Sequence, residues 1–166
     1  MTSLELVSRG QTFLASAYGG YAELPGRERR VLAAAWLCDR VRPREKTGAN
    51  DGEIVEAILD SCGLPIGNPW CAAAQTTVAL VARVGKPIHN PASVREWRLW
   101  AKDDRYIPVK SVRRGDLVTR DYGKGKGHIG IVVKRFGPFI TGIEGNTSAG
   151  ESGSQRDGQG MYRRTR

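Results

Sequence analysis

The stretch that decides the fold is GNPWCAAAQTTVALVARVG, residues 67–85. It begins with turn-forming residues, and Pro69 disfavours helical backbone at the residue before it. From Cys71 to the residue before Gly85 the chain contains neither glycine nor proline, and apolar residues recur at the spacing of a buried helix face. Gly85 and the following Pro87 are typical of a helix end. The pattern predicts a buried helix that begins at or near Cys71.

Cys71 has two interpretations at this position. In the first turn of a helix, unpaired N–H groups and the helix dipole favour a thiolate over a thiol, which suits a nucleophile flanked by Trp70. Most cysteines, however, are small buried apolar residues. This stretch by itself slightly favours the second interpretation, so a catalytic role requires suitable partners elsewhere in the chain.

The charge balance points to an acidic partner without identifying it. The chain has 166 residues, enough for one domain with a full core, and 40% of them are hydrophobic. Lysine and arginine number 26 against 17 aspartates and glutamates, which gives a formal net charge of +9. Such a surface attracts polyanions, including nucleic acid, anionic lipid and the acidic polymers of a bacterial envelope.

The cysteines and histidines indicate no metal site. Three cysteines without a CxxC pair are too few for a disulfide framework, and the chain has two histidines. We therefore predict no metal and no cofactor. Cys38 and Cys62 lie in apolar stretches and are expected in the core, and a bridge between them stays open.

No membrane-spanning or targeting segment is expected. No apolar run approaches the length that a bilayer requires. The Ala-Ser-Ala sequence at 15–17 resembles a signal-peptidase site, but Glu5 and Arg9 interrupt the apolar region that should precede it. We predict a protein without a signal peptide that is made in the cytoplasm.

The order of elements predicts an α+β fold of N-terminal helices packed on a small C-terminal antiparallel sheet. We expect one domain over 1–166, with an N-terminal extension over about 1–26 and a catalytic domain over about 27–166. Residues 161–166 are either a last strand or a solvated basic end. The expected helices lie in 1–18, 27–41, 50–63, 71–84 and 90–101, and the expected strands at 107–109, 117–118, 128–135 and 139–146.

A cysteine hydrolase needs a histidine to accept and return a proton, and a group to orient that histidine. His89 lies in a loop between two prolines, whereas His128 opens a strand after the glycine-rich stretch 123–127. That stretch lacks the spacing of a phosphate-binding loop. We expect its backbone to approach a substrate, with Lys124 and Lys126 adding positive charge. Substrate contacts are assigned to Lys126, Gly127 and, beside the nucleophile, Trp70.

The hairpin that follows offers two partners for His128. A three-residue loop over 135–137 places Glu144 opposite His128, and a loop over 136–138 places Asn146 there. Either register brings the Cβ atoms to about 5 Å, close enough to fix the tautomer of the imidazole. A two-residue loop is expected to break the arrangement. The alternative for Glu144 is an exposed strand carboxylate.

Four motifs occur in an order that resembles the CHAP domain, the cysteine- and histidine-dependent amidohydrolases and peptidases. They are NPWCAAA at 68–74, GDLV at 115–118, GHIGIVV at 127–133 and IEGNTS at 143–148, and the segment 45–59 is also similar. The likeness covers about residue 30 to the C-terminus. It implies a papain-like fold with Cys71 as nucleophile, His128 as base and Glu144 as orienter, and Asn146 matches the fourth polar position.

The resemblance also implies a substrate. Members of this family cleave amide bonds in peptidoglycan, either between muramic acid and alanine or within the peptides, so both an amidase and an endopeptidase fit. Two departures are visible. Ala74-Gln75 stands where the family often has an aromatic and an aliphatic residue, and no acidic loop before Cys71 supports a calcium site.

The expected partner is bacterial peptidoglycan, with anionic wall polymers as a second partner, and nucleic acid is a partner only in one rival interpretation. A bacteriolytic enzyme without a signal peptide suits a phage endolysin, a virion-borne lytic protein or an injected effector. Two rivals stay open. One is a basic, non-catalytic module on nucleic acid or an anionic wall polymer, with Cys71 as a packing residue. The other is a cysteine peptidase that acts on protein.

Overall fold

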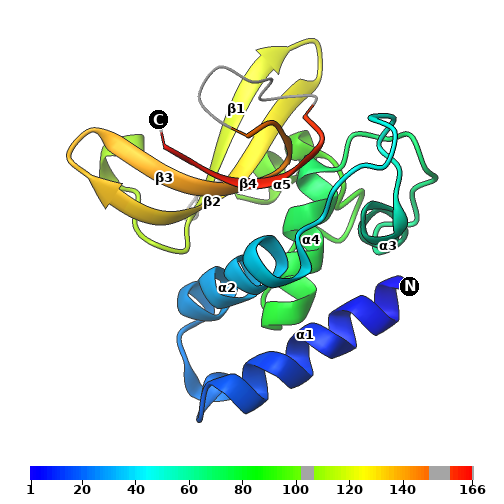
Figure 1. Cartoon of the computed structure of the whole chain (residues 1–166). Helices are drawn as coiled ribbons and strands as arrows, with labels where there is room; N and C mark the ends of the chain where they lie inside the picture. Colours follow the sequence, from blue (N-terminus) through cyan, green and yellow to red (C-terminus); the bar gives the residue numbers. More distant parts are fainter. Residues whose placement is uncertain (102–106, 150–157, 166) are drawn as a thin grey trace.

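The structure, a computed structural model, describes residues 1–101, 107–149 and 158–165. Its N-terminal part is helical and its C-terminal part is an antiparallel sheet, which confirms the α+β class (Figure 1). The main helices are α1 (Ser3–Ala17), α2 (Gly26–Ala35), α3 (Glu53–Asp60), α4 (Cys71–Ala82) and α5 (Val94–Trp100). Shorter turns are η1 (Tyr21–Glu23), η2 (Trp36–Val41) and η4 (Val109–Ser111).

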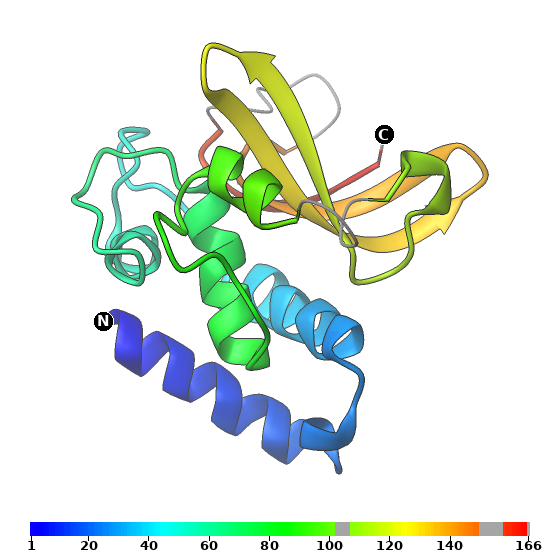
Figure 2. The same ribbon diagram turned by 180° about the vertical axis from the view of Figure 1, so that it is seen from behind.

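Helix α4 is the centre of the molecule. All of its residues except Leu80 are buried, as predicted for the stretch that begins at Cys71. It packs against α1, α2 and α3 on one side and against β2 and β3 of the sheet on the other, while α5 lies near its N-terminal end (Figures 1 and 2). A helix buried on all sides holds its first residue in a fixed place relative to both layers.

Helix α1 is part of the same hydrophobic core. Leu6 and Leu14 are almost fully buried in the main cluster, and Gly10 brings α1 close to its neighbours. A Cβ atom at Gly10 would lie 2.7 Å from the Trp36 ring and 2.8 Å from Val81. The segment set apart as an N-terminal extension therefore shares its packing with the rest of the chain. None of the helices in the described residues has the length and apolar character needed to cross a bilayer.

The sheet is an antiparallel meander in the order β1-β2-β3-β4. Its strands are β1 (Leu117–Gly123), β2 (Lys126–Phe136), β3 (Phe139–Thr147) and β4 (Gly160–Thr165). The strand alternative for the C-terminal end is thus correct through Thr165. The strand predicted at 107–109 is wrong, because Pro108 has no N–H group to donate to a ladder and the chain enters η4.

The pairing of β2 with β3 differs from both expected loops. The connection is a two-residue loop, 137–138, but the register shifts at a bulge around Val133. Beyond the bulge Glu144 pairs with Gly130, two residues along the strand from His128. Beyond the bulge the register is the one expected for a loop over 136–138, so Glu144 does not lie directly opposite His128 and its side chain reaches the imidazole diagonally. The prediction that a two-residue loop would break the arrangement is wrong, because the bulge supplies the missing residue.

Candidate active site

Cys71 lies at the junction of α4 and the start of β2. It is the first residue of α4, and the structure leaves 6% of it exposed. Its Sγ lies 4.0 Å from the carbonyl oxygen of Gly127, the residue before His128. The backbone N–H groups of Ala72 and Ile129 also act on the sulfur. The fold therefore brings the predicted nucleophile to the strand that carries the predicted base.

Burial dominates the acidity of this thiol. It raises the pKa of Cys71 to about 11, although the backbone N–H groups of Ala72, Ile129 and Cys71 itself lower it. The charge of Glu144 acts in the same direction as burial. The expectation that the helix N-terminus favours a thiolate describes only the smaller effect. Burial therefore favours the thiol form of Cys71, and a thiolate would require a nearby proton acceptor.

His128 and Glu144 form a buried pair. Nε2 of His128 lies 3.0 Å from Oε2 of Glu144, and the two residues are only 2% and 4% exposed. Nδ1 of His128 is also buried, and within the described part of the chain it has no hydrogen-bond partner. A carboxylate that accepts from Nε2–H fixes the tautomer and leaves the Nδ1 lone pair free to accept a proton.

Gly130 makes this pair possible. Glu144 lies across from Gly130, so its side chain must cross that position to reach His128. A Cβ atom at Gly130 would lie 2.6 Å from Cγ of Glu144 and 3.2 Å from the carbonyl oxygen of Ile143. Sequence analysis did not single out Gly130. A glycine inside a strand pattern, which often marks a close approach, was the available signal.

In the described part of the chain, the hydrogen-bond partners of the Asn146 side chain do not include the imidazole of His128. It is fully buried in the left-handed region, with φ of 53°. With its amide oriented to suit its neighbours, Oδ1 accepts from the Trp70 N–H at 3.2 Å, and Nδ2 donates to Gly158 O at 2.8 Å and Asn50 Oδ1 at 3.3 Å. These contacts hold the backbone just before Cys71, and the catalytic role of Asn146 stays a prediction.

Trp70 is a core residue rather than a substrate contact. Its side chain is completely buried, and its Nε1 donates to Oε1 of Glu45 at 2.9 Å. The same carboxylate accepts from the Asn50 N–H through Oε2 at 3.0 Å. This corrects the assignment of Trp70 to substrate binding. Through these two hydrogen bonds, the segment that contains Glu45 and Asn50 holds the turn before Cys71 in place.

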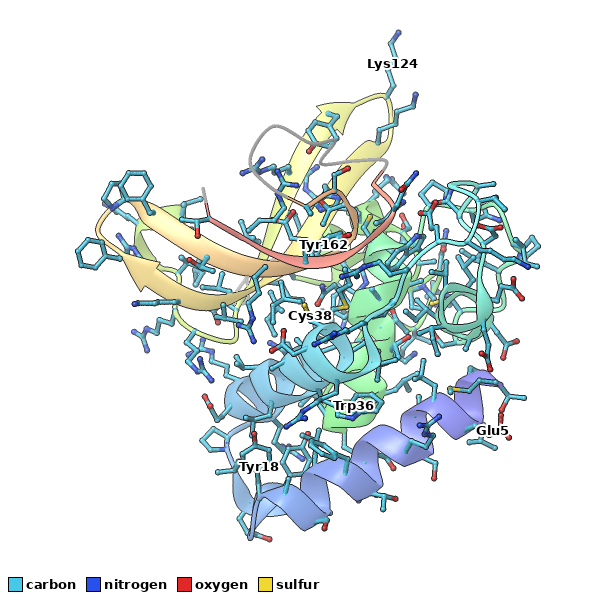
Figure 3. The ribbon with its side chains drawn as sticks, in the orientation of Figure 1. Glu5, Tyr18, Trp36, Cys38, Lys124 and Tyr162 are labelled. Carbon is cyan, nitrogen blue, oxygen red and sulfur yellow. The ribbon has the colours of Figure 1, made fainter. Side chains whose placement is uncertain are left out.

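Lys126 and Gly127 line a small pocket of about 240 Å³. Cys71 is not part of its lining, but the Gly127 carbonyl lies near the Cys71 thiol. The charged lining consists of Asp121, which pairs with Arg98, and four basic residues, namely Arg95, Arg98, Lys124 and Lys126. The preceding glycine-rich stretch forms the tight turn of the β1–β2 hairpin, with positive φ at its central residues. Figure 3 shows Lys124 extending from the end of this hairpin. The pocket therefore presents positive charge next to Gly127, whose carbonyl faces the thiol.

The other candidate groups take no part in this site. Cys38, Cys62 and Cys71 are free thiols, so the bridge left open by the sequence is not formed. Cys38 is buried beside β4, where its Sγ lies 3.7 Å from Met161 O, and burial raises its pKa to about 12. His89 is exposed in its loop. Among the residues that the structure describes, no three His, Cys, Asp or Glu side chains gather as metal ligands would.

Comparison with known proteins found no match to the chain. No family model, no curated protein and no solved structure matches it. The arguments for function are therefore the geometry around Cys71 and His128 and the motifs that carry these two residues.

Proposed function

We propose that this chain is a papain-like cysteine hydrolase that cleaves amide bonds in bacterial peptidoglycan. One observation carries the proposal. A buried imidazole is held by a carboxylate through one nitrogen, its other nitrogen is left unbonded, and the strand that bears it lies against a cysteine at a helix N-terminus. A proton acceptor, its orienting group and a nucleophile are the parts that covalent amide hydrolysis requires.

The reaction begins with transfer of the Cys71 proton to Nδ1 of His128. Because burial raises the thiol pKa to about 11, this internal transfer, rather than loss of the proton to water, generates the thiolate. Glu144 stabilises the imidazolium through Nε2–H. The thiolate attacks the amide carbonyl carbon, and the Cys71 N–H is a donor for the oxyanion.

The second half of the reaction returns the proton and frees the enzyme. The imidazolium of His128 protonates the leaving amine as the C–N bond breaks, which leaves an acyl group on Sγ of Cys71. A water molecule then gives a proton to His128 and attacks the acyl carbon. The thiolate leaves and recovers the proton, so the cycle ends with a thiol and a neutral imidazole.

The substrate assignment rests on the CHAP-like motifs and on charge. The pocket next to Gly127 has a mainly basic lining, which suits the carboxylates carried by wall peptides. Both the muramoyl–alanine bond and bonds within the peptides present an amide next to such groups. The enzyme would meet its substrate after release from the cell that makes it, or after injection into the target.

Digestion of purified peptidoglycan tests the proposal. We expect soluble fragments whose new amine is either the alanine amino group, for an amidase, or a group within the peptide, for an endopeptidase. Cys71→Ala should abolish release while leaving the melting temperature close to that of the wild type. Release at the wild-type rate by Cys71→Ala would refute the mechanism.

The net charge of +9 favours one alternative of another class. A basic module that only binds an anionic wall polymer or nucleic acid would show steeply salt-dependent binding and no turnover. A cysteine peptidase that acts on protein would use the same residues. Cleavage of a denatured protein by the wild type, with intact peptidoglycan left untouched, would identify that activity instead.

A further inference from the structure

The loop end of the β2–β3 hairpin carries aromatic side chains in water. We call residues 136–139 the hairpin tip. Phe136 and Phe139 face each other across the strands and are 77% and 54% exposed. The hairpin that carries them projects from the rest of the sheet (Figures 1 and 2). Single exposed apolar residues are ordinary, but two large ones paired directly across the strands form an apolar patch.

A further exposed apolar residue, Val109, lies in a segment that is hydrogen-bonded to the hairpin. The guanidinium of Arg135 donates to Gly137 O at 3.2 Å and to Lys110 O, so that η4 lies against the end of the hairpin. Val109 in η4 is 66% exposed. The hydrogen bond from Arg135 to Lys110 O therefore links the segment that carries Val109 to the hairpin tip, although the two are distant in sequence.

Cations surround this surface. The segments 107–115 and 132–141 contain five basic residues and no aspartate or glutamate, namely Lys110, Arg113, Arg114, Lys134 and Arg135. Two carboxylates adjoin them. Asp116 pairs at 2.8 Å with Arg27, which is outside these segments, whereas Glu28 pairs at 2.9 Å with Arg114 and offsets one of the five cations. Positive charge around the tip therefore exceeds negative charge.

We propose that the hairpin tip and its basic surroundings bind the surface of an anionic lipid bilayer. Exposed phenylalanines gain free energy by entering the acyl boundary of a membrane, and lysines and arginines beside them interact with anionic headgroups. A soluble polyanion such as nucleic acid or a wall polymer would match the charge but would offer no continuous apolar phase to both aromatic rings. The combination favours lipid.

The lipid surface is separate from the candidate active site. His128 and Phe136 are eight residues apart on one strand, which corresponds to about 26 Å at the rise of a β-strand. The tip can therefore rest on a membrane without covering Cys71. The inference does not depend on the proposed hydrolysis of peptidoglycan.

Sedimentation with vesicles tests the inference in the full chain. The protein should sediment with vesicles of an equal mixture of phosphatidylglycerol and phosphatidylcholine, and much less with phosphatidylcholine alone. The double variant Phe136→Ser, Phe139→Ser should weaken partitioning by about a hundredfold, since burial of each ring contributes roughly tenfold or more. A matched double variant at exposed apolar residues elsewhere, Leu4→Ser with Ile88→Ser, should bind as the wild type does.

A charge pair separates local attraction from net charge. Lys134→Glu and Lys46→Glu change the net charge equally at exposed positions, but only Lys134 adjoins the tip. We expect Lys134→Glu to weaken binding to anionic vesicles several-fold more than Lys46→Glu does. Equal losses would mean that overall charge, rather than this surface, attracts the lipid, and would overturn the proposal.

Insertion has its own readout. The tryptophan of Phe136→Trp should be quenched by brominated phosphatidylglycerol vesicles more strongly than the four native tryptophans of the wild type. The proposal fails if neither vesicle binds, or if the tip double variant binds normally. It also fails if that variant changes only nucleic-acid binding or self-association, because the tip would then serve another partner.

Discussion

Ionisable side chains are usually exposed and large apolar ones are usually buried, but the two ends of the β2–β3 hairpin depart from this pattern. At the end near α4, the ionisable residues His128 and Glu144 are buried. At the other end, Phe136 and Phe139 stand in solvent. Burying ionisable groups costs free energy even when they are paired, and exposing two large apolar rings forgoes the gain from burying them, so both ends are candidates for a function. The proposed chemistry lies at one end of the strand pair and the proposed lipid surface at the other.

The bulge around Val133 allows the two ends to differ. The tight two-residue loop sets one register at the tip, and the bulge shifts it by one residue before the strands reach the site. Without that shift, Glu144 would not pair with Gly130 and the carboxylate would not cross to His128. The strand register is therefore set by the loop at the tip and by the bulge near the site. Variants at one end should have little effect at the other.

The largest difference should come from charge at the buried end. Glu144→Gln keeps the shape but removes the carboxylate that stabilises the imidazolium. It should lower kcat/KM on a soluble muropeptide by about 10²–10⁴-fold, the range of general acid–base contributions. Phe136→Ser should leave that kcat/KM unchanged. Near-normal turnover by Glu144→Gln would remove Glu144 from the mechanism.

A smaller loss of activity is expected for an alanine at Gly130, but not for one at Gly137. Gly130→Ala places a methyl group against Cγ of Glu144 and should lower kcat/KM by about a hundredfold, because an orienting group is displaced. At the tip, a Cβ atom on Gly137 meets nothing within 4 Å, although φ is 55°. Gly137→Ala should cost about 1 kcal/mol of stability and no activity. Equal activity in the two variants would contradict the crossing of Glu144 over Gly130.

Asn146→Ala should act mainly on stability. It removes the side chain that links the Trp70 N–H to Asn50 and Gly158, and a buried donor left unbonded costs about 1–3 kcal/mol. Chemical denaturation should report that loss, while kcat/KM falls much less than in Glu144→Gln. If Asn146→Ala is inactive at unchanged stability and Glu144→Gln is active, the orienter is Asn146.

The last effect, absent at neutral pH, is a dependence of stability on alkaline pH. Burial raises the pKa of Cys38 from 9.0 to about 12 and that of Cys71 from 9.0 to about 11. Because the unfolded chain loses these protons first, the stabilisation is complete below pH 9 and is lost as the pH rises through the folded values. Each thiol should contribute a slope of about 1.4 kcal/mol per pH unit just above the unfolded pKa.

Denaturant unfolding of the wild type and Cys71→Ala across this range measures the Cys71 share. The slope of the variant should be shallower, and the double variant Phe136→Ser, Phe139→Ser should show the wild-type slope. A Cys71→Ala slope equal to that of the wild type would contradict the burial effect on this thiol.

Local patterns in the sequence were enough to predict much of the scaffold. The α+β class, the helix that begins at Cys71 and the paired strands that carry His128 and Glu144 follow from periodicity, turn residues and side-chain alternation, all of which act over a few neighbours. With only two histidines, the search for a base also had few outcomes. These features need no knowledge of distant contacts.

Tertiary structure decided the rest, because the remaining features depend on residues far apart in the chain. The bulge near Val133 depends on how two strands and the core beneath them fit together, and periodicity does not register one extra residue. The buried Trp70 donates through its indole N–H to Glu45, which is far away in the sequence. Its backbone N–H is accepted by the side chain of Asn146, another distant residue. The acidity of Cys71 is set by burial, which exceeds the local effect of the helix end. Burial is a property of the whole packed molecule, so only the fold determines it.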